Sequence, residues 1–269
     1  MAGKLTNYAE NKLLDHVLMN TAYPRPANLW LALCTADPGE GATGANIVEP
    51  VAMGYARQPC DDWGSAASRA IANDAAITYS VASGNWGTIT HFAVLDSVTA
   101  GAGNVLVYGT VTPNKAINTG DIASIEIGDL DVSWDAGGVS DYLANALLDH
   151  LLAGSAWAQP AQIYVALSQA TLADSDTGTH LATHEPGENY ARIKHDDWHT
   201  AAAGASSNSG AVIFAKATGG SWGTIAAFAL VNTLVTGNIL LKAAVTTAKH
   251  IAVGDTAKFL EAELDCTMD

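Results

Sequence analysis

The segment NKLLDH occupies residues 11–16 of this chain, and it returns as NALLDH at residues 145–150. Other matches keep the same order at a spacing of 134 to 136 residues: YAR at 55–57 and 190–192, DDW at 61–63 and 196–198, and WGTI at 86–89 and 222–225. A period of this length indicates duplication of a whole domain rather than a short solenoid repeat. The sequence therefore predicts two tandem homologous domains, residues 1–135 and 136–269, joined near Gly137-Gly138.

Each repeat is predicted to open with one α-helix. In residues 6–19 and again in 140–153, leucine and valine side chains recur at the three- and four-residue spacing of one helix face. Thr6 and Ser140 stand at the start, where a hydroxyl can accept a hydrogen bond from a free N–H group of the first turn. Asn20 and Gly154 stand at the end, and both residue types tolerate the left-handed backbone that often ends a helix.

After each helix the pattern changes to short runs rich in β-branched and aromatic residues, separated by Gly, Asn, Asp and Ser. The runs occur at residues 29–33, 75–81, 89–95, 104–111 and 122–133, and at 163–167, 210–216, 225–231, 238–245 and 256–267. Several short strands after one helix are typical of a small β-sandwich. We therefore expect a mainly β fold of two tandem homologous β-sandwich, jelly-roll-like domains.

The composition excludes several classes of partner. Charged residues make up 14% of the chain and hydrophobic residues 49%, which is typical of a packed globule. A formal net charge of −15 repels phosphate backbones and anionic lipids, so neither nucleic acid nor a membrane is expected as a partner. No stretch approaches the ~20 apolar residues of a membrane span. Residues 1–7 also lack the apolar core of a secretion signal.

The three cysteines are Cys34, Cys60 and Cys266, an odd number without a C-x-x-C pair. This usage indicates neither a disulfide framework nor a zinc site, and it fits assembly in the cytosol. A protein without a secretion signal then leaves the cell by another route, such as lysis.

No catalytic residues and no cofactor are predicted. The chain contains no G-x-S-x-G elbow, Walker A loop, H-E-x-x-H pair or dinucleotide fingerprint. His16 and His150 each follow an aspartate at a helix end, where the carboxylate can orient a histidine as a base. A histidine in a last turn also interacts favourably with the helix dipole, and this structural role is the one that we predict.

The two DDW segments are the best candidate binding site. Each follows an arginine, so an ion pair can form beside an aromatic ring, and a flat ring near carboxylates is a workable carbohydrate contact. A partly buried structural cluster is the interpretation that we favour over a carbohydrate contact. The candidate binding residues are Arg57, Asp61, Asp62 and Trp63 and, in the second repeat, Arg192, Asp196, Asp197 and Trp198.

The second repeat also has two H-x-x-x-H pairs, His180 with His184 and His195 with His199. Four imidazoles can hold a transition metal, but no helix is predicted there to align them, so no metal site is predicted. The segment DSDTG at residues 174–178 begins like a calcium loop and lacks the glutamate that closes an EF-hand, so a solvated loop is expected.

A further set of residues extends over the whole first domain: residues 7–16 and 29–40, GYARQ at 54–58 and WGTITHF at 86–92. With these residues the chain resembles a family of tailed-bacteriophage virion proteins. The resemblance is close over residues 4–135 and looser over 139–269. Members are typically single domains described as tail-fibre, minor tail or head decoration proteins. The resemblance implies no catalytic residues, and it implies a virion protein that is assembled in the host cytoplasm and released by lysis.

Within such a virion we expect a head decoration, or cement, protein on the capsid exterior. The chain has neither heptads nor Gly-X-Y repeats, so a long fibre shaft is not expected. Two fused domains can bind neighbouring sites of a shell with avidity. The expected partners of this non-enzymatic structural protein are the major capsid protein or other virion proteins, and a homo-oligomer is expected, with a trimer favoured.

Two other functions compete with this expectation. A tail-fibre or tail-tip associated receptor-binding protein needs exposed loop aromatics, such as Tyr23, Trp63 and Trp157, to hold host carbohydrates. An enzyme, either a depolymerase or a metal hydrolase around residues 180–199, needs a close carboxylate pair in a cleft or a bound metal.

Overall fold

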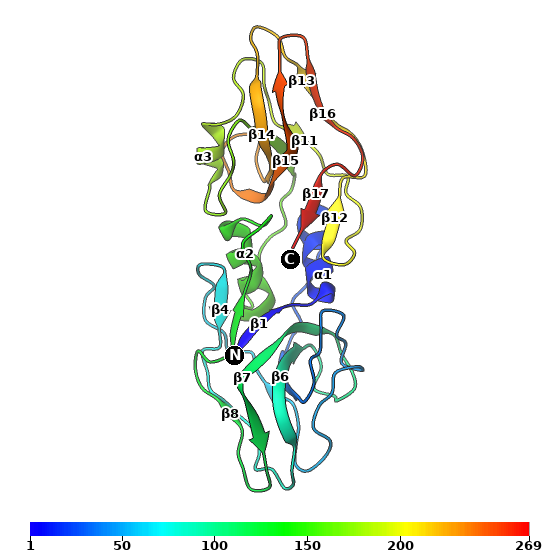
Figure 1. Ribbon diagram of the computed structural model, residues 1–269, viewed down its shortest axis with the longest axis vertical. Helices are drawn as coiled ribbons and strands as arrows, with labels where there is room; N and C mark the ends of the chain where they lie inside the picture. Colours follow the sequence, from blue (N-terminus) through cyan, green and yellow to red (C-terminus); the bar gives the residue numbers. More distant parts are fainter. Residues whose placement is uncertain (269) are drawn as a thin grey trace. The chain divides into compact units, whose positions relative to one another are not determined.

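The computed structural model describes residues 1–268 and confirms a mainly β tandem fold with a helix near the start of each repeat (Figure 1). The first repeat contains β1 (Ala2–Leu5), α1 (Asn7–Leu18), β2 (Trp30–Cys34), β3 (Gln58–Pro59), β4 (Ala70–Ala72), β5 (Ile77–Thr78), β6 (Gly87–Leu95), β7 (Val105–Ile117), β8 (Ser124–Ile125) and β9 (Asp131–Ser133). The second repeat contains α2 (Asp141–Leu148), the π-helical turn η1 (Asp149–Ala153), β10 (Tyr164–Ser168), α3 (Gly178–Ala182), β11 (Ile193–Lys194), β12 (Ala205–Ser207), β13 (Val212–Lys216), β14 (Gly223–Val231), β15 (Ile239–Ile251), β16 (Thr256–Phe259) and β17 (Asp265–Thr267). None of the described helices is long and apolar enough to cross a membrane.

The chain packs into two compact units that do not follow the repeats throughout. Unit 1 consists of residues 1–10, 24–135 and 145–157, and unit 2 consists of residues 11–23, 136–144 and 158 onward. The predicted domains, residues 1–135 and 136–269, therefore stay a prediction. Each unit takes one helical segment from the other repeat.

In unit 1 one curled sheet contains seven strands in the order β3-β2-β6-β7-β1-β9-β4. Strand β1 lies inside the sheet, antiparallel to β7 and parallel to β9, and so joins β9 and β4 to the other four strands. Strands β5 and β8 form a separate pair. The sequence did not predict β1, because residues 2–5 contain a single bulky apolar side chain, Leu5.

Unit 2 has corresponding strands but a divided sheet. Strands β11-β10-β14-β15 form one sheet, while β12 pairs with β17 and β13 pairs with β16. Val139, which occupies the position of Leu5, forms only an isolated bridge to Leu241. The residues before the second helix therefore do not add a central strand to this unit.

The predicted helix ends are confirmed. The hydroxyl of Thr6 accepts a hydrogen bond from the amide of Ala9 at 3.3 Å, and the hydroxyl of Ser140 accepts one from Leu143 at 3.1 Å. Each hydroxyl also donates to a strand carbonyl, that of Val105 or that of Ile239. Asn20 and Gly154 adopt positive φ angles of 52° and 74°. Equivalent positions of the two repeats thus start and end the two helices.

Two long predicted strands are each interrupted by a turn. Residues 122–133 form β8 and β9, separated by a turn in which Gly128 has a φ of 80°. Residues 256–267 form β16 and β17, separated by a turn in which Ala262 has a φ of 60°. These predictions were wrong because a run of β-forming residues does not show where a left-handed residue breaks the pairing.

A buried asparagine holds each of these turns. The side chain of Asn73 donates to the carbonyl of Glu126 at 2.9 Å and accepts from the amide of Leu130 at 2.9 Å. Asn208 makes the equivalent bonds to Leu260 and Leu264. Each asparagine thereby satisfies main-chain groups that would otherwise be buried without partners.

In each repeat the helix carries an asparagine and, four residues later, an aspartate, and the two side chains bind a hairpin turn. In unit 1, Ser68 and Arg69 form a two-residue turn with φ angles of 52° and 66°. Asp149 accepts the amide of Ala66 at 2.7 Å, and Asn145 accepts the amide of Arg69 at 2.8 Å. We call this arrangement the helix–turn clasp.

Unit 2 contains the same clasp. Asp15 accepts the amide of Ala201 at 2.8 Å, and Asn11 accepts the amide of Gly204 at 2.9 Å. In each unit the helix and the turn come from different repeats. The strongest sequence match in the chain therefore serves to hold each exchanged helical segment in its unit.

We expect Asp149→Ala to lower the free energy of unfolding by about 1–2 kcal/mol, because a half-buried amide loses a charged acceptor. Asp15→Ala should have a similar effect through unit 2. Urea unfolding followed by circular dichroism measures both changes. The control is Asp74→Ala, since Asp74 is exposed. Equal stabilities of the three variants would mean that the clasp contributes nothing.

Candidate functional site

Arg57, a predicted binding residue, is 3% exposed and forms a buried ion pair with Glu49. Its Nη2 lies 2.7 Å from Oε2 of Glu49, and Nη1 donates to the carbonyl oxygens of Ser97 and Ala102 at 2.8 and 2.9 Å. The hydroxyl of Tyr55 donates to Oε1 of Glu49 at 2.9 Å. The guanidinium thus joins the loop of Glu49 to the loop between β6 and β7 and is not presented to solvent.

The second repeat builds the same cluster around Arg192, which pairs with Glu185 at 2.8 Å. Its Nη1 donates to the carbonyl oxygens of Thr233 and Thr236 at 3.0 and 2.7 Å. In both repeats the arginine pairs with this glutamate rather than with the carboxylates of the DDW segment. Arg57 and Arg192 therefore do not form the ion pair that was considered beside the tryptophan.

The DDW segments lie in a different part of each unit. Asp61 accepts the amide of Leu29 at 2.7 Å, and Trp63 is 8% exposed with its Nε1 donating to the carbonyl of Cys60 at 2.6 Å. The side chains of Asp62 and Asp197 are exposed. Carbohydrate binding by these residues stays a prediction, and the exposed carboxylate is the part of the segment that a ligand can reach.

Asp196 and Trp198 repeat this arrangement. Asp196 accepts the amide of Ile163 at 3.0 Å, and Trp198 is 5% exposed with its Nε1 directed at the carbonyl of His195. Neither tryptophan ring therefore offers an open face. Tyr23 and Trp157, the other aromatics that receptor binding would use, are half-buried.

His16 and His150 are buried and act as hydrogen-bond acceptors. Nδ1 of His16 accepts the amide of Tyr23 at 3.2 Å, and Nδ1 of His150 accepts the amide of Trp157 at 3.1 Å. A nitrogen that accepts an N–H carries no proton, so this geometry requires a neutral imidazole. The predicted structural role fits this arrangement, although the contact is to a loop amide rather than to the helix dipole.

Tryptophan and tyrosine form a buried cluster in each unit. The ring of Tyr55 lies 5.3 Å from that of Trp86 and 6.0 Å from that of Tyr79. Tyr190 has the same relation to Trp222 and Phe214, at 5.4 and 5.9 Å. The glycine that follows each tryptophan has a positive φ, as a tight entry into the next strand requires.

Unit 2 contains the two histidine pairs that were considered as metal ligands. A helix does form at one of them: α3 carries His180, whose Nε2 lies 3.3 Å from Nε2 of His184. The expectation that no helix occurs there was therefore wrong. His195 is buried, whereas His199 is exposed and lies 3.4 Å from Glu261. Within residues 1–268, no three His, Cys, Asp or Glu side chains gather so that they could hold a metal ion.

The calcium-like segment uses its carboxylates for local contacts. Asp174 pairs with Lys242 at 2.7 Å, and Asp176 lies 2.9 Å from Nδ1 of His180. Asp176 also accepts the amide of Ala173 at 2.7 Å. The two carboxylates are therefore explained by contacts within the fold.

Unit 1 exposes an apolar loop, which we call the Met53 patch: Val51, Met53 and Val81 are 86%, 50% and 55% exposed. The amide of Ser83 donates to the carbonyl of Met53, which places the two loop segments together. Ala52 and Met53 both have positive φ, an uncommon conformation for residues other than glycine. The position of Met53 in the second repeat is Glu188, so the patch is not repeated.

Sequence reasoning missed Glu49 and Glu185, the partners of the two arginines. A signal was available, because each glutamate precedes a proline: Glu49-Pro50 returns as Glu185-Pro186. Asn73 and Asn208 also recur at the domain spacing, and neither had been noted. In each case the recurring residue forms part of the buried polar framework.

The two units define the class of the protein: a duplicated β-rich protein whose recurring polar side chains stabilise the fold. A family model described as "Podophage GP4 fiber I protein gp80" matches residues 4–133 and again residues 138–267. These two matches cover nearly the whole chain, and the chain belongs to this family. It is therefore a structural protein of a phage virion.

The family match corrects one expectation. The family is one of fibre proteins, so head decoration of the capsid is not supported, and the tail-fibre alternative agrees better. No curated protein matches the chain.

We expect Arg57→Met to lower the free energy of unfolding by about 3–5 kcal/mol, because it leaves the carboxylate of Glu49 buried without its partner. The double variant Arg57→Met with Glu49→Leu should lose less, since no unpaired charge remains. Arg192→Met and Glu185→Leu form the matched pair in unit 2. Chemical denaturation measures these changes, and a double variant that is less stable than the sum of the single ones would contradict the explanation.

The buried thiols and phenols predict a loss of stability at alkaline pH. Burial raises the pKa of Cys34 and of Cys266 to about 12, and it raises the pKa of Cys60, Tyr55, Tyr79 and Tyr190 as well. In the unfolded chain thiols ionise near about 8.5 and phenols near about 10. Because the folded state holds these protons more tightly, the stabilisation is complete below pH ~8.5 and declines as the pH rises toward 12.

Urea unfolding at a series of pH values between 7 and 11 measures this decline. Cys266→Ala should make the decline shallower than in the parent protein. A stability that stays constant up to pH 10.5, or rapid reaction of the folded protein with a thiol reagent at pH 8, would contradict the prediction.

Proposed function

We propose that this chain is a non-enzymatic structural subunit of the tail fibres of a phage virion. Its family is described as a fibre protein, and both repeats match that family. The proposal replaces the head decoration role and adopts the alternative of a tail-fibre component.

One observation carries the structural part of the proposal. The polar side chains that recur in both repeats serve the fold: Asp15 and Asp149 bind hairpin turns, His16 and His150 accept loop amides, and the two buried arginines fix loops. If catalytic residues had been duplicated with the domain, their side chains should instead point into a cleft in both repeats. This distribution supports a subunit without catalysis.

The surface on which the two units differ supports a role in assembly or adhesion. The Met53 patch of unit 1 is apolar and exposed, and Glu188 gives the equivalent loop of unit 2 an acidic side chain. Exposed apolar patches are typical of protein contact sites. We therefore assign the contact with another component of the fibre or with the host surface to the Met53 patch.

Oligomerisation as a trimer and contact with the major capsid protein remain predictions. The fibre role favours a homo-oligomer, because fibres are commonly built from several copies arranged around one axis. It favours other tail proteins, rather than the capsid, as partners.

The test is the position and copy number of the chain on purified virions. Gold-labelled antibodies against this protein should mark the tail region, and quantitative gels should give a few tens of copies or fewer per particle. An antibody against the major capsid protein serves as the control for labelling of the head. Hundreds of copies spread over the head would overturn the proposal.

A further inference from the structure

Unit 2 brings two imidazoles together at its surface. His180 lies on α3 (Figure 1), and His184 follows four residues later, the spacing that places two side chains on one side of a helical turn. Their Nε2 atoms are 3.3 Å apart, and the ring centroids are 4.7 Å apart. We call these two side chains the α3 histidine pair.

The pair is specific to the second repeat, which is longer at this point. The main-chain hydrogen bonds that flank the segment occur in both repeats: Gly44 to Gly103 and Thr35 to Val48 in the first, Gly178 to Gly237 and Gln169 to His184 in the second. Val48 follows Gly44 by four residues, whereas His184 follows Gly178 by six. Residues 44–48 form no helix, and valine occupies the position of His184. The longer segment forms α3 and provides the second imidazole.

A carboxylate fixes the first ring of the pair. Oδ1 of Asp176 lies 2.9 Å from Nδ1 of His180, and its Oδ2 accepts the amide of Ala173 at 2.7 Å. An ionised carboxylate only accepts hydrogen bonds, so Nδ1 of His180 carries a proton, and in the neutral ring Nε2 has the free lone pair. A carboxylate that holds the far nitrogen in this way is the usual partner of a metal-binding histidine.

The backbone that carries both rings is held by the core of unit 2. Leu181 of α3 is fully buried among apolar residues of β10 and β14. The hydroxyl of Thr177 accepts the amide of His180 at 3.3 Å, and the carbonyl of His184 accepts the amide of Gln169 at 2.8 Å. The positions of the two rings therefore depend on buried and hydrogen-bonded neighbours, and the fold does not require the imidazoles themselves.

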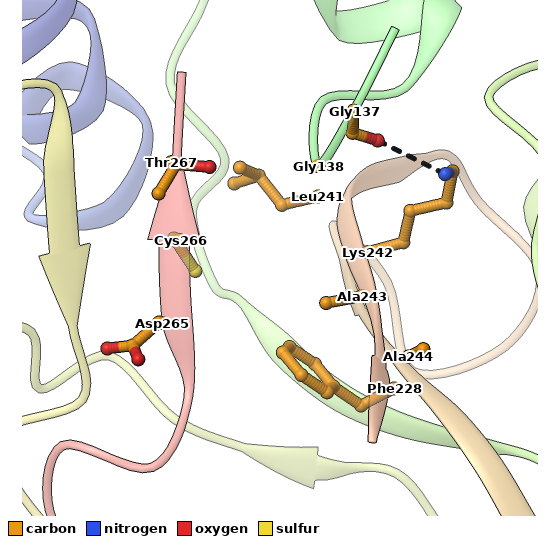
Figure 2. A pocket seen from close by; sticks show the side chains of 10 residues that line it. All are labelled: Gly137, Gly138, Phe228, Leu241, Lys242, Ala243, Ala244, Asp265, Cys266 and Thr267. Carbon is orange, nitrogen blue, oxygen red and sulfur yellow. Dashed lines mark hydrogen bonds between the residues drawn. The ribbon is translucent and has the colours of Figure 1, made fainter. Parts of the chain in front are cut away.

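The segment before α3 is also fixed. Asp174 forms an ion pair with Lys242 at 2.7 Å. Nζ of Lys242 also donates to the carbonyl of Gly137, as the dashed line in Figure 2 shows. The segment that contains Asp176 is thus tied to β15. A site whose supporting groups are already in place loses little conformational freedom when it binds a ligand.

We propose that the α3 histidine pair binds one Zn²⁺ ion through the two Nε2 atoms. Imidazole nitrogen is a preferred ligand of zinc, with bonds of about 2.0–2.1 Å in tetrahedral geometry, and two such ligands are about 3.3–3.4 Å apart. The α3 histidine pair already has this separation. Within residues 1–268 no third His, Cys, Asp or Glu completes the set, so water molecules fill the other two positions.

Binding requires one proton to change place. Nε2 of His180 has no proton in the neutral ring, so the hydrogen bond between the rings uses a proton on Nε2 of His184. When the ion binds, that proton leaves Nε2 and Nδ1 of the same ring takes one from water. Both imidazoles stay neutral, and both Nε2 lone pairs face the ion.

A structural role of the hydrogen bond between the rings is a weaker explanation of the pair. The side chain of His180 is 49% exposed, and a bond between exposed groups replaces bonds to water with little net gain. An ion held by both nitrogens makes use of the fixed tautomer and of the spacing. The inference goes beyond the proposed function and does not depend on where in the virion the chain lies.

The test is calorimetric titration of the full-length protein, without a histidine tag, with ZnCl₂. Mg²⁺ at about 5 mM occupies weak sites on surface carboxylates, because this ion prefers oxygen ligands to imidazole. We expect one Zn²⁺ per chain to bind saturably below about 0.1 mM free ion. Long-range ¹H–¹⁵N spectra of the imidazoles should show the Nδ1-protonated form of two histidines in the zinc complex.

Matched variants test the location. His180→Ala and His184→Ala should each weaken Zn²⁺ binding at least tenfold, whereas His199→Ala, which removes an exposed histidine beside Glu261, should leave it unchanged. Circular dichroism checks that the variants fold, and the imidazole spectra of the parent protein decide if one does not. Lack of saturation up to about 0.1 mM Zn²⁺, or equal binding by His180→Ala, overturns the proposal. Loss of binding in His199→Ala would place the ion elsewhere and overturn it as well.

Discussion

The amides of two tight hairpin turns impose the constraint on which both units depend. A turn with two left-handed residues cannot satisfy all of its own N–H groups, and a partly buried N–H group needs an acceptor. The helix supplies two acceptors one turn apart, an asparagine and an aspartate, while the leucines between them are buried. A single helical turn therefore combines apolar packing with the capping of a hairpin. This explains why NKLLDH and NALLDH match more closely than most of the surrounding sequence.

The other buried polar side chains also make equivalent contacts in the two repeats. Arg57 and Arg192 each bind two loop carbonyls and one glutamate, and Asn73 and Asn208 each fix a turn between two short strands. Such groups are costly to bury and become favourable only when every bond is made. Once duplicated, the framework tolerates little change. The surfaces are freer to change, and the Met53 patch occurs in one unit only.

Much of the fold could be predicted because its signals are local. Helix positions, the hydroxyls of Thr6 and Ser140 and the left-handed ends at Asn20 and Gly154 depend on neighbouring residues alone. Strand β1 could not be predicted, since its pairing depends on strands about a hundred residues away and its own sequence carries one large apolar residue. The exchange of helical segments could not be predicted from the sequence either, because nothing at Ala66 indicates that its partner is Asp149.

The candidate site was predicted less well, and for a physical reason. Arg57, Asp61 and Trp63 lie close together in the sequence, but they join different clusters because the backbone between them passes through β3. Proximity in sequence indicated one site where the structure has two. The Glu-Pro pairs held the missing information, since the partner of a buried arginine should recur with it when the domain is duplicated.

The exchanged helical segments also determine when each unit can form during protein synthesis. Asp15 and its partner amide on Ala201 are 186 residues apart, and Asp149 and Ala66 are 83 apart. On the ribosome, unit 1 is incomplete until residue 157 has emerged, and residues 11–23 wait until most of the second repeat is made. Throughout that interval the apolar face containing Leu13, Leu14 and Val17 lacks its final partner. Apolar surface that is exposed during synthesis favours aggregation, so the time needed to make the second repeat sets how long this chain is exposed to that risk.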